Sequence, residues 1–355
     1  MFASHSSASF DQWLGNILKE LANDVQKALR ENLIALILGG GYGRGEGGVL
    51  IENWLEKPYN DLDLTLIVRN PSIVSQENLN LIKLNYEGKL GIHVDFSRPL
   101  TPAQIRAWPN ILMWHDLYQG HQVLSGKNDI LSLLAPKRIY SSLPLIEATR
   151  LLLNRGTGLL WALRILRGCE KTPDPDFIRR NYFKCALALG DSLLITFGRY
   201  KVPYSGRDLL FQKLSSENQK VGFLALDSLY KEALCFKFRP NSTSLNPSTE
   251  NDILDIVQKW KQVFLLVENE RTRRKWIDLD TYCRWSGLRE PSLSLPHLWI
   301  KNFVLNRRLN LWSWRYPREL LYPLLPQLLK PKEEISLVSW KESSQFFLSV
   351  WNNFN

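Results

Sequence analysis

The chain has 355 residues, 45% of them apolar, and a formal net charge of +10 at neutral pH. This length is enough to bury a large core and favours two domains. No apolar run reaches the roughly 20 residues that span a bilayer, and the start of the chain lacks the basic and apolar regions of a secretory signal. Four scattered cysteines indicate free thiols in a reducing compartment. We therefore expect a cytoplasmic protein with no membrane association.

The N-terminal part of the sequence predicts a small α/β domain at residues 1–135. Apolar residues near helical spacing, with charged residues between them, indicate an amphipathic helix at residues 10–31. An apolar run at 33–38 predicts a buried strand that leads through a glycine-rich stretch into a second helix. The elements expected after it are strand 62–68, strand 90–96, helix 103–119 and strand 121–126. This order predicts a small mixed sheet with flanking helices.

The remaining residues, 136–355, predict an all-helical domain. Leucine-rich helical periodicity recurs there at residues 144–168, 177–200, 206–237, 250–270 and 319–330. Residues 1–130 hold 11 Lys and Arg against 14 Asp and Glu, a net charge of −3, so the rest of the chain carries +13. This asymmetry favours an anionic partner such as RNA or an acidic protein, although a basic surface kept for solubility explains it equally well.

One stretch, LILGGGYGRGEGG, runs straight out of the apolar strand and carries seven glycines: Gly39, Gly40, Gly41, Gly43, Gly45, Gly47 and Gly48. Such a turn opens backbone N–H groups to a phosphate at the start of a helix. Asp61 and Asp63 follow two positions apart in a predicted strand, so both side chains project to one face. Asp95 lies in the next predicted strand. Carboxylates are preferred Mg²⁺ ligands, so the pattern predicts a site for a nucleoside triphosphate and a divalent metal.

The segments GGYGRGE, DLDL and VDF, in this order, resemble the motif set of the polymerase-β-like nucleotidyltransferase superfamily. They are most similar to its minimal and aminoglycoside-type bacterial members. Carried over by position, the resemblance implies that Gly40, Gly41 and Arg44 hold phosphate. The interval between Gly41 and Asp61 is longer than is usual in the family, so it is expected to contain an insertion or a longer helix.

The same resemblance implies an enzyme that moves an NMP group from an NTP to an acceptor hydroxyl and releases pyrophosphate. In this scheme Asp61 and Asp63 bind Mg²⁺ or Mn²⁺, while Asp95 completes the metal site and assists deprotonation of the acceptor. In two-metal phosphoryl transfer, one ion activates the attacking oxygen and the other stabilises the leaving group. The expected acceptor is an RNA end, a protein side chain or a small molecule such as an aminoglycoside. The implied architecture is an α/β nucleotidyltransferase domain followed by a helical domain that selects the acceptor.

Other interpretations of the glycines and aspartates remain. The run from Gly43 to Gly48 also fits G-x-G-x-x-G, the dinucleotide fingerprint. A Rossmann unit, however, places its acidic residue at the end of the second strand, whereas Asp61 and Asp63 stand at the beginning of theirs. A purely structural interpretation treats the glycines as a tight turn and the aspartates as a charged strand edge. A catalytically inactive nucleotide-binding protein, for instance part of a toxin–antitoxin pair, is the main alternative from another class.

A nucleic-acid-binding protein that uses its C-terminal half is a further alternative. Cations and aromatic residues alternate there: Arg271, Arg273, Arg274, Lys275, Trp276, Trp285, Trp299, Arg307, Arg308, Trp312, Trp314 and Arg315. Such a mixture can stack on bases and neutralise phosphates, and it also fits a tryptophan-rich helical core with cation–π pairs. Arg179, Arg180 and Lys184 are additional candidates for phosphate contacts, and the seven-residue spacing of Lys184 and Asp191 allows one helix face to carry both.

Overall fold

The computed structural model describes residues 1–140, 142–291, 295–306, 315–334 and 336–354. The chain forms two compact units. The first contains Met1–Pro144, Tyr200–Leu210 and Lys231–Ser244, and the second contains Leu145–Arg199, Phe211–Tyr230 and Leu245–Asn355. The domain boundary expected at residues 135/136 stays a prediction, because compactness does not establish that a segment folds independently.

A four-stranded sheet lies at the centre of the first unit, in the order β5–β4–β1–β6. β1 (Leu33–Leu38) is antiparallel to β4 (Leu62–Val68) and to β6 (Gln122–Ser125), whereas β5 (Val94–Phe96) runs parallel to β4. The sheet is therefore mixed. With its flanking helices and the helical second unit, it confirms the predicted fold class.

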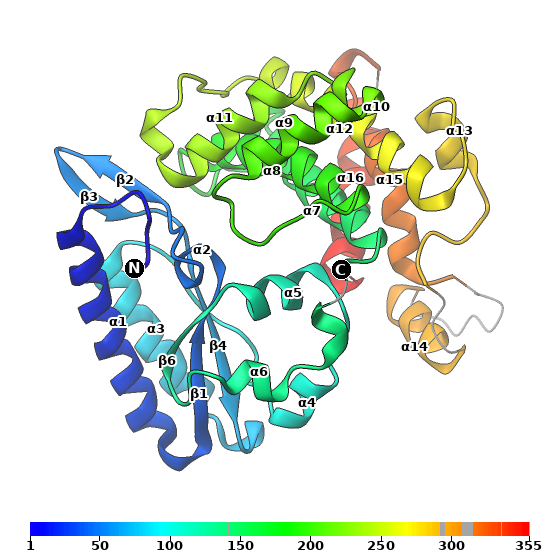
Figure 1. Ribbon diagram of the computed structural model, residues 1–355. Coiled ribbons are helices and arrows are strands. Elements are labelled where there is room, and N and C mark those ends of the chain that lie inside the picture. The colour runs from blue at the N-terminus through cyan, green and yellow to red at the C-terminus, as the bar shows by residue number, and fades with distance from the viewer. Residues whose placement is uncertain (141, 292–294, 307–314, 335, 355) are drawn as a thin grey trace. The chain divides into compact units, whose positions relative to one another are not determined.

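Helices cover both faces of this sheet (Figure 1). α1 (Ala8–Leu29) and α3 (Gln76–Leu90) pack on one face and share a hydrophobic core with β1 and β4. α4 (Pro102–Arg106), α5 (Leu112–Gln119) and α6 (Ile130–Leu134) pack on the other face and form a second core. The amphipathic helix predicted at the start of the chain is thus present, and its apolar stripe faces the sheet.

The alternation of side chains along β4 assigns its residues to these two cores. Leu64 lies in the core formed with α1 and α3, whereas Ile67 lies in the core on the opposite face. Asp61 and Asp63 are separated from Ile67 by an even number of positions, so they project to the same face as Ile67. Both aspartates are exposed, because they stand where the strand begins, beyond the packed core.

The glycine-rich stretch leads into a single helical turn, α2 (Gly40–Gly43), and not into the full helix expected there. The following interval forms a β-hairpin of β2 (Val49–Glu52) and β3 (Leu55–Pro58). Its two turn residues, Asn53 and Trp54, have φ of 50° and 66°. Two consecutive residues with positive φ are typical of a type I′ hairpin turn. The extra length before β4 is therefore a hairpin.

Helix α3 is not predicted by the sequence pattern. Its buried face carries Leu79, Tyr86 and Leu90. Leu81 and Leu84, in contrast, are 62% and 63% exposed and obscure that apolar stripe. The strand predicted at 90–96 is shorter than expected, because Leu90 ends α3 and Gly91 caps that helix in the left-handed region at φ +68°. The single helix expected after this strand divides into α4 and α5.

Helices make up the second unit. Those that lie wholly within it are α7 (Ile146–Leu166), α8 (Phe177–Thr196), α10 (Gln219–Gly222), α12 (Glu250–Thr272), α13 (Leu279–Arg284), α14 (Leu295–Asn306), α15 (Leu321–Leu328) and α16 (Leu337–Phe354). α9 (Arg207–Glu217) and α11 (Asp227–Phe238) contain residues of both units. The helix expected at 206–237 is thus divided into three. Across the described residues, no helix is both long and apolar enough to cross a membrane.

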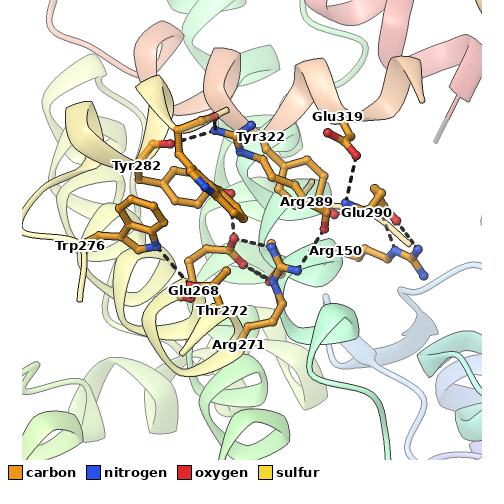
Figure 2. A network of polar contacts seen from close by, with 12 residues as sticks. Arg150, Glu268, Arg271, Thr272, Trp276, Tyr282, Arg289, Glu290, Glu319 and Tyr322 are labelled. Carbon is orange, nitrogen blue, oxygen red and sulfur yellow. Dashed lines mark hydrogen bonds and ion pairs between the residues drawn. The ribbon is translucent and has the colours of Figure 1, made fainter. Parts of the chain in front are cut away.

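A buried polar network joins several helices of the second unit (Figure 2). Glu268 of α12 is fully buried and accepts hydrogen bonds from the Thr149 hydroxyl at 2.6 Å and the Tyr282 hydroxyl at 2.7 Å. Arg271 donates to both of its carboxylate oxygens at 2.6 Å. These hydrogen bonds hold α7, α12 and α13 together, because a buried polar group that loses its partner costs folding free energy.

Candidate functional site

The glycine-rich stretch turns sharply at the end of β1 and packs against β4. Gly39 donates its backbone N–H to the carbonyl oxygen of Asp63 at 2.8 Å. Gly40 has a φ of +60°, and a Cβ at this position would stand 1.8 Å from Oδ2 of Asp63. Gly40 therefore meets two requirements of the turn, a left-handed backbone and room for the Asp63 carboxylate.

This turn presents backbone donors and is fixed by a buried tyrosine. The N–H groups of Gly40, Gly41 and Tyr42 occupy the first turn of α2 and have no partner within the helix. The Tyr42 side chain is fully buried, and its hydroxyl donates to the Gly48 carbonyl at 2.8 Å and accepts the Tyr59 N–H at 3.0 Å. Tyr42 thus holds both ends of the hairpin against the glycine turn.

The three predicted carboxylates lie on adjacent strands. β4 and β5 pair in parallel with Asp63 opposite Asp95, and laterally paired residues point to the same face of a sheet. Asp61 shares this face because it precedes Asp63 by two positions. All three residues are exposed to solvent, but the exposure of Asp63 is partial, since its carboxylate packs against Gly40. The structure therefore brings Asp61, Asp63 and Asp95 together at one end of the sheet, beside the glycine turn.

The charges around Asp63 act on one another. Loss of hydration raises the pKa of Asp63 above that of an ordinary aspartate, and the negative charges of Asp61 and Asp95 raise it further. Two cations, Arg44 and Lys237, oppose this rise. Such mutual effects require proximity. The site is thus a cluster of three acids bordered by two basic side chains.

Arg44 follows the glycine turn, and its side chain is only 10% exposed. Its Nε lies 3.7 Å from Oε2 of Glu46, and its Nη1 lies 3.9 Å from Oδ2 of Asp116. Among the described residues, this Nε is a buried atom without a hydrogen-bond partner. A buried donor without a partner costs free energy, so Nε has donor capacity to offer an anion. The role of Arg44 as a phosphate ligand stays a prediction.

Lys237, in the last turn of α11, is a site residue that the sequence did not reveal. Its Nζ lies 4.9 Å from the centroid of the Tyr204 ring and 3.5 Å from where a Cβ on Gly41 would stand. The segment around Tyr204 is fixed by buried Glu46, which accepts the N–H groups of Tyr204 at 3.0 Å and Ser205 at 2.8 Å. No local pattern marks Lys237, because tertiary packing alone brings it to the glycine turn.

The donor set suits a hard divalent cation in its chemistry, since it consists of three carboxylates, two of which raise the pKa of the third, Asp63, after the larger effect of lost hydration. Across the described part of the chain, however, no three His, Cys, Asp or Glu side chains stand close enough to hold an ion together. Asp63 Oδ2 is directed over Gly40. A three-carboxylate metal site therefore requires side-chain rotation of Asp61 and Asp95, which exposed carboxylates allow.

The phosphate-contact candidates in the helical part have local partners. Arg179 and Arg180 form ion pairs with aspartates of the loop before α8, at 3.9 Å and 2.7 Å. Asp191 is buried and accepts a hydrogen bond from the Tyr230 hydroxyl at 2.6 Å, whereas Lys184 is exposed. Helix α8 therefore does not present Lys184 and Asp191 together on one exposed face.

Several arginines and tryptophans that suggested nucleic-acid binding contact other residues of the second unit. Arg271 pairs with buried Glu268, as Figure 2 shows. The guanidinium of Arg274 lies 5.7 Å and 5.2 Å from the ring centroids of Trp276 and Trp285. These contacts favour the interpretation of a helical core with cation–π pairs. Four other members of this set lie outside the described residues: Arg307, Arg308, Trp312 and Trp314.

Comparison with known proteins gives matches among solved structures only. No family model matches the chain, and no curated protein does. The chain is similar to the spectinomycin adenyltransferase AAD(9) from Enterococcus faecialis, crystallised with ATP and spectinomycin, at 15% identity and a TM-score of 0.39, over 69% of this chain and 98% of that one. It is also similar to a nucleotidyltransferase-like protein from Exiguobacterium sibiricum, at 10% identity and a TM-score of 0.28, over 72% and 77% of the two chains. Similarity this low identifies no corresponding residues.

Proposed function

We propose that this protein is a metal-dependent nucleotidyltransferase, which moves an NMP group from an NTP to an acceptor hydroxyl and releases pyrophosphate. The observation that carries this proposal is the packing of the Asp63 carboxylate over Gly40, with Asp95 opposite Asp63 on the next strand. A phosphate-binding turn and a carboxylate cluster thus share one end of the sheet. A dinucleotide site has no use for three carboxylates at that point.

The triphosphate binds at the glycine turn in this proposal. The N–H groups at the start of α2 point away from the helix and can donate hydrogen bonds to an anion. No side chain of Gly40 or Gly41 hinders this approach. Lys237 adds a mobile positive charge close to Gly41. Arg44 adds the unused donor at Nε. Together these groups offset the negative charge that the triphosphate brings to a cluster of aspartates.

Asp61 and Asp63 would hold Mg²⁺ or Mn²⁺, and Asp95 would complete the site. When bound, the metal neutralises the α-phosphate and polarises the oxygens of the transfer reaction. Asp95 accepts the proton of the acceptor hydroxyl. The acceptor oxygen then forms a bond to the α-phosphorus, and the bond from this phosphorus to the bridging oxygen breaks, so that pyrophosphate leaves. A bound cation would relieve the repulsion that Asp61 and Asp95 exert on Asp63, and this favours metal binding.

The main competing function is nucleotide binding without transfer, and Asp95 separates the two. We expect Asp95→Asn to retain most of the Mg²⁺-dependent NTP binding, measured by calorimetry, while it loses pyrophosphate release by about 100-fold or more. The double variant Asp61→Asn/Asp63→Asn should lose both. If wild-type protein binds NTP with Mg²⁺ but forms no pyrophosphate with RNA, protein or small-molecule acceptors, the protein is a binding module. If wild-type protein does not bind NTP at all, the proposal is wrong.

A further inference from the structure

A cavity lies within the helical unit, and none of the residues of the proposed transferase site line it. It has a volume of about 570 Å³ and lies among α7, the start of α8, the loop between them, and α16. Known small-molecule sites typically measure about 300–1,000 Å³. Its walls combine aromatic rings, two cations and side-chain amides, a mixture that a purely structural cavity does not need.

The acidic residues around this cavity are already neutralised by arginines that do not line it. Glu170 pairs with Arg164 at 2.7 Å. In the same loop, Asp174 pairs with Arg180 at 2.7 Å, and Asp176 lies 3.9 Å from Arg179. Each carboxylate of the loop thus has an arginine partner; Glu170, which lines the cavity, accepts from Arg164 through its Oε1.

Two cations at the cavity, in contrast, lack such balance. Arg155 of α7 and Lys171 of the loop both line it, and among the described residues neither makes an ion pair or a hydrogen bond. The Arg155 charge does reach the buried Cys185 thiol, whose pKa it lowers slightly against the larger effect of burial. A guanidinium and an ammonium without anionic partners, at the wall of one cavity, form a site for an anion.

The remaining wall is aromatic. Trp161 of α7, Phe177 of α8 and Trp351 of α16 line the cavity and are partly exposed. Trp351 is held by a stacked contact with Phe347, at 6.4 Å between ring centroids and 14° between ring planes. Partly exposed rings around one cavity offer their faces to a planar group, and Trp is the aromatic residue with the largest face. The amide of Asn181 stands among them and can bond to the edge of such a group.

We propose that this cavity binds a nucleoside monophosphate group, with the base among Trp161, Phe177 and Trp351 and the phosphate on Arg155 and Lys171. The two cations can bind an anion, the rings can stack on a planar group, and the cavity volume accommodates one nucleotide. Two ligands carry such a monophosphate group: a free nucleotide and the 5′-phosphorylated end of an RNA strand. The inference does not depend on the proposed transferase activity.

The test is calorimetric titration in EDTA of the variant Asp61→Asn/Asp63→Asn, so that the transferase site does not contribute. AMP, GMP, CMP and UMP are titrated first, with adenosine and ribose 5-phosphate as probes that lack the phosphate or the base. We expect at least one monophosphate to bind with a Kd below about 1 mM and each truncated probe to bind at least about tenfold more weakly. A 5′-phosphorylated RNA hexamer that binds more tightly than the free nucleotide identifies a strand end as the ligand; the reverse order identifies a free nucleotide.

Variants assign the binding to this cavity. Arg155→Gln and Trp351→Leu should each weaken the monophosphate by about tenfold or more. Lys171→Gln, in the exposed loop, gives a second cation variant that leaves the helices intact. Lys275→Gln, an exposed lysine elsewhere in the helical unit, is the charge-matched control and should leave the Kd within about twofold. The inference is overturned if no monophosphate or hexamer binds, or if folded Lys171→Gln and Trp351→Leu bind as the parent does.

Discussion

At the residue scale, the closest packing in the proposed active site is between Gly40 and Asp63. Gly40→Ala introduces a Cβ that would stand 1.8 Å from the Asp63 carboxylate, at a φ of +60°. We expect this change to cost at least about 1 kcal/mol of unfolding free energy and to weaken NTP binding more than tenfold. Urea denaturation and calorimetry measure the two effects.

Gly88→Ala is the matched control, because a Cβ at Gly88 in α3 meets nothing within 4 Å. This variant should be as stable as wild type or more stable by about 0.5–1 kcal/mol, and it should bind NTP normally. Equal behaviour of the two variants would show that the turn at Gly40 is not required in its present form.

The raised pKa of Asp63 predicts how the stability of the protein depends on pH. The pKa of Asp63 is raised in the folded protein, so Asp63 takes up a proton on folding within a range of pH. This range extends from the pKa of an ordinary aspartate up to the raised pKa. As the pH rises through it, the folded state loses stability. Without metal, Asp63→Asn should therefore raise Tm at pH 7 by about 1–3 °C. The gain should shrink toward pH 4 and below, where wild-type Asp63 is protonated in both states. A lower Tm for the variant at pH 7 would mean that the neighbouring cations outweigh the repulsion.

Part of this site could be predicted from the sequence. The parity of Asp61 and Asp63 on a strand places both on one face from sequence alone, and the glycine spacing marks the turn. Lys237 and Asp116 could not be found in this way, because the first reaches the turn from α11 and the second reaches Arg44 from α5. Contacts between distant segments leave no local pattern.

At the element scale, the β2–β3 hairpin has an unusual turn. Trp54 has a φ of +66° and is 97% exposed, so it bears backbone strain and buries almost no surface. Trp54→Gly should stabilise the protein by about 0.5–1 kcal/mol in urea denaturation, since glycine suits a type I′ turn. Leu55→Gly, in the adjoining strand, should destabilise it. A loss of stability in Trp54→Gly would contradict this account of the turn.

The hydrogen-bond network around Glu268 allows a second prediction at this scale, which concerns its contribution to the free energy of unfolding. Glu268→Gln removes the charge that holds Arg271 and weakens the bonds from α7 and α13, so we expect a loss of about 2–4 kcal/mol in unfolding free energy. Glu270→Gln, two positions away, breaks only a partly exposed pair with Lys220 and should cost less than about 1 kcal/mol. Equal losses, measured by denaturation, would show that the buried network contributes no more than a surface pair.

Elements with a dense apolar pattern were predictable, and those without one were not. The strands at 33–38 and 62–68 were expected with the bounds that β1 and β4 have, because buried strands are nearly continuous apolar runs. Helix α3 packs Leu79, Tyr86 and Leu90 into the core at helical spacing, but the exposed leucines at 81 and 84 obscure this apolar stripe in the sequence. The hairpin depends on two residues with positive φ, of which one is a tryptophan, and this departs from the usual glycine signal.

At the scale of the whole molecule, the two units divide the chemistry. The first unit holds the glycine turn, the three aspartates and Lys237, and the second holds a buried polar network and a basic, aromatic cavity. The excess positive charge of residues 131–355 lies on side chains other than those in ion pairs such as Arg164 and Arg180, whose charges are cancelled by their acidic partners. The part without partners in the described chain includes Arg155 and Lys171. The proposed monophosphate site would use these two cations.

The most direct test of the central claim is transfer of label from α-³²P-NTP. Wild-type protein is incubated with each of the four NTPs, Mg²⁺ and a cell lysate as the source of acceptors, beside Asp61→Ala/Asp63→Ala. We predict that one NTP labels RNA, a protein or a small molecule with wild type alone, since the two aspartates are required for the reaction. The class of labelled product then identifies the acceptor. No label with any NTP, or equal label with the double variant, would contradict the account.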